Sequence, residues 1–271
     1  APEQPQNGEP RTGLSMGDHA AITAREMKVS REAQDELALA SHQNLHKAWE
    51  EGFFTDLTTG FLGVNRDTNL RPDSSLESLA KLKPVFGKHD AEQHGAQATM
   101  TAGNSTPLTD GASVALLSSE DWAAEHNIEP RAFLVDSETA AVDFVHGPDG
   151  LLMAPTYAVP RLLERNNLSL QDFDFYEVHE AFASQVLATL SAWEDETYCR
   201  ERLGLQSALG PIDRSKLNIK GSSLAAGHPF AATGTRILAT TAKILEENGG
   251  GRALISICAA GGQGVAAIVE R

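Results

Sequence analysis

The amino-acid sequence predicts a layered α/β domain in its carboxy-terminal half. Short apolar segments typical of strands alternate there with segments that have the period of helices. Strands are predicted at residues 131–136, 173–178 and 252–257, and helices at residues 155–166, 181–193 and 230–248. Alternation of this kind is typical of helices packed on a sheet. A polar, irregular stretch at residues 194–216 is predicted to be an insertion between core elements.

The amino-terminal part of the chain predicts a helical lobe with long loops. Ser30 is a good N-cap for a helix that Gly52 ends. One helical stripe runs between them, formed by Ala33, Leu37, Ala40, Asn44 and Ala48. A shorter helix is predicted to open at Asp18. Residues 53–86 have an irregular pattern with many turn residues, which indicates a loop-rich region.

The composition excludes several classes of function. The chain of 271 residues carries 22 Lys and Arg against 37 Asp and Glu, which gives a net charge of −15. An acidic protein repels nucleic acid and anionic lipid, so neither is an expected partner. The longest apolar stretch, residues 253–269, is interrupted by Gly261, Gly262 and Gly264. That interruption predicts two buried strands around a tight turn and no membrane span.

Cysteine use indicates a reducing compartment. The chain has two cysteines, Cys199 and Cys258, which have no metal-ligand spacing and make no disulfide framework in a chain of this length. No metal site is therefore expected. No signal peptide is visible, and the expected location is the cytoplasm, or an organelle matrix if the source is a eukaryote.

Three short segments place a reactive side chain where a strand or loop meets tight backbone. The segment HEAF puts His179 between a strand and a helix, and GHPFAATG puts His228 in a loop that enters a helix. The segment CAAGGQG puts Cys258 directly after an apolar strand. Helix N-termini favour developing negative charge, and small residues let a substrate approach the main chain.

Each of these residues taken alone has a simpler interpretation. A lone histidine at a helix start is typically a cap or a hydrogen-bonded partner, and a cysteine at a strand end is typically a small core residue. The order and setting of the three together favour a functional interpretation. Because ligands in α/β folds bind outside the carboxyl ends of strands, we expect His179, His228 and Cys258 to converge on one cavity.

These three segments, in this order, resemble the C-terminal signatures of the thiolase family, the acetyl-CoA acyltransferases or 3-ketoacyl-CoA thiolases. The resemblance covers nearly the whole chain, since it extends upstream through residues 15–17, 30–54, 67–86, 101–104 and 110–112. The forms HEAF and CAAGG are most similar to the trifunctional-complex β-subunit type. Members of that type act on longer acyl chains beside a hydratase/dehydrogenase α subunit.

The resemblance implies a thiolase-like fold and a division of the chain. Residues 1–90 would form the loop domain, residues 91–120 the end of the N-terminal thiolase domain, and residues 121–271 the C-terminal domain. The C-terminal domain is expected to hold a mixed five-stranded sheet covered by helices. A helix that begins near Ala181 would be buried between the layers, and the N-terminal half-domain would be present only as a remnant.

The resemblance also implies a chemistry, the thiolytic cleavage of a 3-ketoacyl-CoA by CoA in fatty-acid β-oxidation, or the reverse condensation. His228 would activate the nucleophilic thiol and donate to an oxyanion. Cys258 would be the acid and base for the α-carbon of acetyl-CoA. His179 would serve the oxyanion hole of the thioester enolate, and Ala260 would offer a backbone N–H where most thiolases have Gly.

Substrate binding and assembly follow from the same resemblance. CoA and acyl-CoA would be substrates, with no separate cofactor. Residues expected at the pantetheine tunnel and near the nucleotide are Met16, Ala102, Thr106, Phe182 and Lys83. The assembly would be a homodimer or homotetramer, with a hydratase/dehydrogenase α subunit as a possible partner.

One departure from the family pattern leaves the function open. The cysteine that is acylated in thiolases lies upstream of the segment at Ser15 and Met16, and residues 1–14 contain no cysteine. Cys199 matches no family nucleophile. The expectation is a fragment of a longer polypeptide, because all three other groups are retained, and an upstream part on a separate chain is an alternative. The alternatives are a non-catalytic acyl-CoA-binding or scaffold subunit, and a ketoacyl-synthase-like condensing enzyme, against which Cys258 argues.

Overall fold

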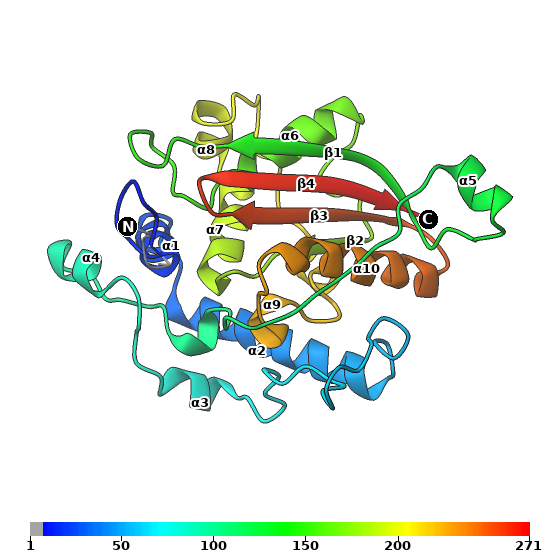
Figure 1. Ribbon diagram of the computed structural model, residues 1–271. Helices are drawn as coiled ribbons and strands as arrows, with labels where there is room; N and C mark the ends of the chain where they lie inside the picture. Colours follow the sequence, from blue (N-terminus) through cyan, green and yellow to red (C-terminus); the bar gives the residue numbers. More distant parts are fainter. Residues whose placement is uncertain (1–7) are drawn as a thin grey trace, which may run out of the picture.

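The computed structural model describes residues 8–271 and centres on one mixed sheet. The strands are β1 (Phe133–Ala141), β2 (Phe175–Val178), β3 (Arg252–Ala259) and β4 (Gln263–Glu270), in the spatial order β1-β4-β3-β2 (Figure 1). β4 pairs antiparallel with both β1 and β3, and β2 runs parallel to β3. The parallel pair brings the carboxyl ends of β2 and β3 to one edge of the sheet.

The expectation of a five-stranded sheet is wrong for the described residues, which form a four-stranded sheet. Beside β2, where a fifth strand would lie, Leu217 makes a single parallel bridge to Tyr176. The next residue, Asn218, has φ of +46° and turns the backbone away. Its side chain replaces the ladder, because Oδ1 accepts from Val178 N–H and Nδ2 donates to Val178 O, both at 2.9 Å. The fifth strand is therefore reduced to one bridge.

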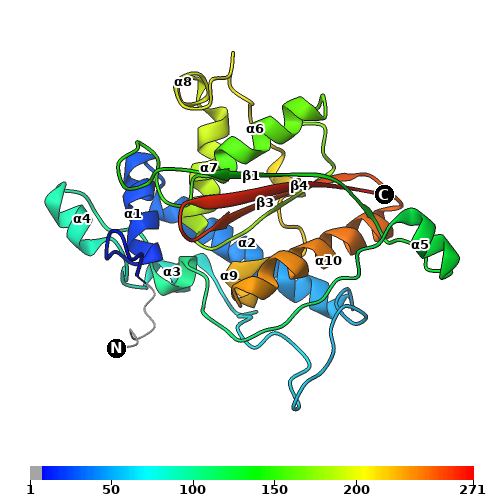
Figure 2. The ribbon, with the colours of Figure 1, turned by 45° about the horizontal axis from the view of Figure 1, so that its top comes forward.

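Helices cover both faces of the sheet. Figure 2 shows α6 (Pro155–Arg165) and α7 (Ala183–Glu194) on one side and α10 (Ala231–Asn248) on the other. Side chains alternate along β3, so that Leu254 packs in the core with α6 and α7 while Ala253 and Ile255 pack with α10. As predicted from the sequence, the helix that begins near Ala181 is buried, since most of α7 is inaccessible to solvent.

The amino-terminal residues form a lobe of helices and loops beside the sheet. Ser15 and Ser30 cap the first two helices, where their hydroxyls accept from Asp18 N–H and Ala33 N–H. Helices α1 (Met16–Glu26) and α2 (Arg31–Glu50) pack against α7, and α2 also packs against α9 (Ser223–Ala226) (Figure 1). The helices of this lobe and of the segment that follows are α1 (Met16–Glu26), α2 (Arg31–Glu50), α3 (Leu76–Ala80), α4 (Lys88–Gln93), the 3-10 turn η1 (Ala102–Asn104) and α5 (Glu120–Glu125).

Two boundaries differ from the sequence prediction. β1 continues to Ala141 because Asp136 and Glu138, which look like loop residues, pair with Arg165 of α6 along an exposed edge strand. The polar stretch at residues 194–216 is also more ordered than predicted. It contains α8 (Glu196–Glu201) and the 3-10 turn η2 (Arg214–Lys216), and it precedes α9 (Ser223–Ala226).

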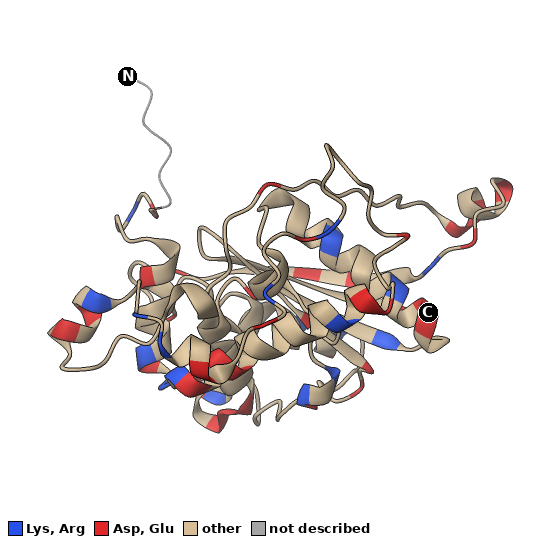
Figure 3. Cartoon of the chain, turned by 90° about the horizontal axis from the view of Figure 1, so that it is seen from below, with Lys and Arg blue, Asp and Glu red and all other residues tan. Residues whose placement is uncertain are grey.

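Charge is spread over the molecule. Acidic and basic residues are interspersed along the helices seen from below, with no single basic patch on that face (Figure 3). Within residues 8–271, no helix is both long enough and apolar enough to cross a membrane.

Candidate active site

His179 lies at the carboxyl end of β2. Its N–H donates to Ser256 O of β3 at 2.8 Å, which continues the parallel ladder by one residue. Alternation along the strand points Tyr176 and Val178 into the core beneath α6 and α7. His179 points the other way and is only 1% exposed. A histidine in this position is held by the sheet and shielded from water.

His228 lies in the loop that enters α10. The preceding Gly227 has φ of +98°, and a Cβ there would meet Thr109 Cγ2 at 2.6 Å, so only glycine fits. The His228 N–H donates to Pro107 O at 3.1 Å, and its Nδ1 is hydrogen-bonded to Thr233 Oγ1 at 2.7 Å. Main chain and side chain are therefore both anchored.

The two imidazoles lie against each other, with ring centroids 4.4 Å apart and an interplanar angle of 52°. Burial, and after it His228 and Arg236, holds the pKa of His179 well below its ordinary value. Burial, and after it Arg236, also lowers the pKa of His228. Both rings are therefore neutral at neutral pH, when each can act as a hydrogen-bond donor on one nitrogen and an acceptor on the other.

Cys258 lies near the end of β3, two residues beyond the Ser256 that holds His179, and so at the same edge of the sheet. Its partner across the hairpin is Gly264, where a Cβ would meet Pro155 N at 2.6 Å. Burial raises the pKa of the Cys258 thiol to about 12. The thiol therefore keeps its proton at neutral pH and is suited to donate it.

The residues expected to contact CoA lie in two groups. Phe182 and Met16 belong to the apolar cluster that contains Cys258, and Thr106 joins the site through its N–H to Ala181 O and its hydroxyl to Ser223 O. Ala102 and Lys83 are both exposed and lie in segments joined by the bridge between Pro84 and Thr101.

Ala260 lies in the tight turn between β3 and β4 and is exposed. It is not among the non-glycine residues of positive φ in residues 8–271, so its backbone is unstrained. The two glycines that follow it, Gly261 and Gly262, take up the left-handed conformation of the turn. The backbone N–H at this position is therefore available whether the residue is Gly or Ala.

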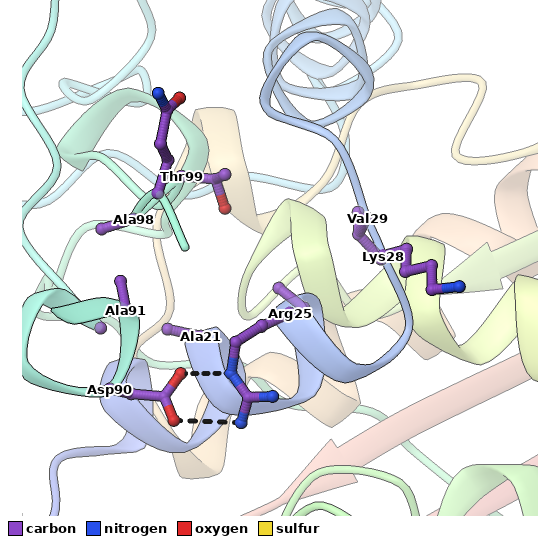
Figure 4. Close-up of a pocket in the computed structure, with 11 residues that line it drawn as sticks. Ala21, Arg25, Lys28, Val29, Asp90, Ala91, Ala98 and Thr99 are labelled. Carbon is purple, nitrogen blue, oxygen red and sulfur yellow. Dashed lines mark hydrogen bonds and ion pairs between the residues drawn. The ribbon is translucent and has the colours of Figure 1, made fainter. Parts of the chain in front are cut away.

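Neither of two surface pockets includes the histidines or Cys258 in its lining, so a single shared cavity stays a prediction. One pocket adjoins the site and is lined by residues 108–111 with Pro229 and Phe230, directly after His228. The other lies between α1 and α4, where Arg25 Nε and Nη2 donate to Asp90 at 2.7 and 3.0 Å (Figure 4). The lining of that pocket comes from α1, from α4 and the glycine before it, and from residues 28–29 and 97–99.

Sequence reasoning missed a group of buried polar residues behind the histidines. Arg236 of α10 donates from Nη2 to Ser223 Oγ at 2.9 Å, and Ser223 Oγ is hydrogen-bonded to His179 Nδ1 at 3.0 Å. Glu177 is buried nearby, and burial raises its pKa to about 8. The available signal was Arg236 itself, a charged residue on a helix predicted to pack on the sheet.

Glu180 is held by a separate set of hydrogen bonds. Its carboxyl group accepts from Ser41 Oγ at 2.6 Å, Asn218 Nδ2 at 2.7 Å and Leu224 N at 3.1 Å. These contacts tie α2, the reduced fifth strand and α9 to the residue after His179. The position of His179 therefore depends on three elements outside its own strand.

Two neutral imidazoles in contact with each other, and one protonated thiol, lie at the carboxyl edge of the same mixed sheet, and such groups can accept and donate protons. Within residues 8–271, no group of three or more His, Cys, Asp or Glu is arranged to hold a metal ion. The chemistry open to this site is acid–base catalysis at a carbon or a thiol.

Comparison with known proteins identifies the family. The family model described as "Thiolase, C-terminal domain" matches residues 128–271, and the one described as "Thiolase, N-terminal domain" matches residues 9–121. The chain belongs to the thiolase family. The predicted resemblance and the thiolase-like α/β fold are confirmed.

Individual proteins that are similar to this chain support the same family assignment. The 3-ketoacyl-CoA thiolase of Yersinia enterocolitica is 42% identical over 275 residues, which cover 99% of this chain and 61% of the relative. The acetyl-CoA acetyltransferase of Bacillus anthracis superposes with a TM-score of 0.79 at 34% identity. Human mitochondrial 3-ketoacyl-CoA thiolase superposes with a TM-score of 0.78 at 32% identity. Both structural alignments cover 97% of this chain and 61% of the other, so the chain spans about three fifths of these relatives.

Proposed function

We propose that the chain supplies the acid–base groups of a 3-ketoacyl-CoA thiolase, an acyltransferase that cleaves a 3-ketoacyl-CoA with CoA or runs the reverse condensation. The observation that carries the proposal is the pair of neutral imidazoles of His179 and His228. Their ring centroids are 4.4 Å apart, and they lie at the sheet edge where Cys258 also lies. The acylated cysteine is assigned to the part of the thiolase fold that this chain does not span. Retention of all three groups argues against a purely structural subunit.

Each group has one step in the proposed cleavage reaction. With Nδ1 bonded to Thr233, neutral His228 takes the proton of the nucleophilic thiol, and the thiolate attacks the 3-keto carbon. The bond between C2 and C3 breaks with its electron pair on C2, and Cys258 Sγ–H gives its proton to that carbon. His179 donates to the enolate oxygen of the departing acetyl-CoA. The thiol of CoA then returns a proton to Cys258, and the CoA thiolate attacks the acyl thioester. The nucleophilic cysteine leaves as a thiolate and takes its proton back from His228, which regenerates the site.

The same proposal places CoA over the two groups of contacts described above. Met16 and Phe182 would line the pantetheine tunnel close to Cys258, and Ala102 would lie at its mouth. Thr106 donates its hydroxyl to Ser223 O, so a contact with pantetheine would use the acceptor side of Oγ1 or the methyl group. Lys83 would reach the nucleotide phosphates as a point charge.

Other parts of the proposal rest on the family resemblance. A boundary near residue 120 is supported by family matches that end at 121 and begin again at 128, and the division at residue 90 is proposed from the resemblance alone. A role in β-oxidation, a homodimer or homotetramer, and a hydratase/dehydrogenase α subunit as partner are proposed from the HEAF and CAAGG segments. A cytoplasmic or organelle-matrix location is proposed from cysteine use.

The test is thiolysis by this chain joined to a thiolase segment that carries the nucleophilic cysteine. Loss of 3-ketoacyl-CoA absorbance with CoA is followed for wild type, His228→Ala and His179→Ala, with the exposed His89→Ala as control. We expect losses of about 10²–10⁴ for the base and about 10²–10³ for the oxyanion donor. Full activity in His228→Ala would refute the proposed role of His228, and an inactive wild type would refute the proposed function.

A further inference from the structure

The hydroxyl group of Ser223 joins Arg236 to His179. Arg236 Nη2 lies 2.9 Å from Ser223 Oγ, and the same oxygen lies 3.0 Å from His179 Nδ1. Ser223 is fully buried and His179 is 1% exposed. The three groups come from α10, α9 and the end of β2, so only the folded chain brings them together.

The number of protons available decides the direction of these hydrogen bonds. A hydroxyl has one proton to donate and two lone pairs that accept, and a guanidinium has donors only. Arg236 therefore donates to Ser223 Oγ. If His179 Nδ1–H also donated to that oxygen, the hydroxyl proton would need a further acceptor. Within residues 8–271, Ser223 Oγ has no other hydrogen-bond partner. The hydroxyl proton is therefore directed at His179 Nδ1.

The consequence concerns the far nitrogen of the ring. A neutral imidazole carries one proton, and a ring that accepts at Nδ1 carries that proton on Nε2. His179 Nε2 is buried and has no hydrogen-bond partner in the described part of the chain. Buried polar groups are normally paired, so an unpaired donor at this point indicates that a ligand atom completes it.

We infer that Ser223 and Arg236 are positioning residues that lock His179 in the Nε2–H tautomer, so that it presents a neutral donor to the thioester oxygen of the substrate. The functional half of this inference rests on the proposed thiolase activity. The other tautomer would point a lone pair at the enolate oxygen and repel it. A histidine donates to an oxyanion only from the ring nitrogen that carries the proton, so its tautomer must be fixed before it can serve in an oxyanion hole.

The first test reads the tautomer directly and requires no activity. Long-range proton–nitrogen correlation spectra of the chain labelled with ¹⁵N-histidine distinguish a protonated ring nitrogen from a bare one, and His179→Gln assigns the signals. We expect wild type to show the Nε2–H pattern and Ser223→Ala to show a mixture of tautomers. The Nδ1–H pattern in wild type would overturn the inference.

The neighbouring residue provides a matched control. Ser222 is also fully buried, and its hydroxyl has no hydrogen-bond partner within the described residues. Ser222→Ala removes the same atoms and must leave the His179 pattern unchanged. If Ser223→Ala fails to fold, as judged by near-UV circular dichroism, Arg236→Met tests the same relay. Without the guanidinium donor, the Ser223 hydroxyl can bond in either direction, and mixed tautomers are again expected. An unchanged pattern in a folded variant would overturn the inference.

A second test separates the control of the His179 tautomer from the thiolase activity. In the joined protein, Ser223→Ala is expected to lower kcat by up to about 10²-fold, the lower end for loss of one oxyanion donor, with little change in KM. Ser223→Thr, which keeps the hydroxyl, should recover most of that loss. An inactive wild type with the Nε2–H pattern would refute the proposed function and leave the tautomer lock supported. Full activity in a Ser223→Ala variant with mixed tautomers would overturn the oxyanion role.

Discussion

The imidazoles of His179 and His228 touch at 4.4 Å between centroids although they come from a strand end and a separate loop. Each ring is kept neutral by burial, by the nearby Arg236 and, for His179, by the other ring. Protonation of either ring is therefore unfavourable, because the added positive charge would be buried and close to Arg236. The pair therefore works in one charge state only, which makes the stability and the chemistry of this site sensitive to acid.

We expect the free energy of unfolding to fall as the pH drops below about 6.5, the ordinary pKa of histidine in the unfolded chain. Because burial lowers the pKa of His179 in the folded state, the unfolded state binds more protons in this window, and stability rises with pH. The free energy of unfolding can change by at most about 1.4 kcal/mol per pH unit for each ring. Urea unfolding at several pH values measures the effect. His179→Gln should lose less stability than wild type on acidification, and parallel curves would contradict the assignment.

Glu177 is expected to act in the opposite direction. Burial, with a contribution from Glu180, raises its pKa from 4.5 to about 8, against the opposing effect of Arg236. The folded state therefore binds more protons than the unfolded state between these values, and stability falls as pH rises through the window. Glu177→Gln does not titrate, so its stability relative to wild type should increase from about pH 5 to about pH 8, by roughly 1.4 kcal/mol per unit at most.

The control for this measurement is Glu201→Gln, which changes an exposed carboxylate on α8. The change with pH that is expected for Glu177→Gln should clearly exceed any change in this exposed control. A Glu177→Gln difference that stays constant from acid to alkaline pH would show that the Glu177 carboxyl is ionised in the folded protein at neutral pH.

Asn218 is expected to be necessary for stability beyond its backbone conformation. Its amide satisfies both backbone groups of Val178 and also donates to Glu180. Asn218→Ala leaves these buried groups unpaired, at a cost of about 1–3 kcal/mol for each. Asn127 has a similar φ of +54° but is exposed, so Asn127→Ala carries the same backbone strain without the buried hydrogen bonds. Urea unfolding should show a much larger loss for Asn218→Ala, and equal losses would exclude the side-chain role.

Both thiols are expected to react slowly in the native chain. Cys199 and Cys258 are buried, and burial raises the pKa of each. Because the thiolate is the reactive form, Ellman's reagent near neutral pH should titrate neither thiol quickly, and both after denaturation. For the same reason this chain alone should show no thiolysis. Rapid native labelling that disappears in Cys258→Ser would mean that the Cys258 thiol is open and ionised.

The sequence by itself predicted many of the local elements and singled out three candidate reactive residues. The period of apolar residues and the caps at Ser30 and Gly52 predicted α2 within two residues at each end. The motifs around His179, His228 and Cys258 predicted where loops meet strands. These features depend on neighbours in the chain, and short-range sterics and hydrogen bonds are encoded by short-range sequence.

Only the tertiary structure decided the charge states and the hydrogen bonds that link distant elements. Nothing near Asn218 in the chain indicates that its amide substitutes for a strand, because the groups it satisfies belong to β2. Glu177, Ser223 and Arg236 are likewise ordinary polar residues in their own segments. Packing removes water from them and sets one against another, and it is this desolvation that changes the pKa values of Glu177 and Cys258.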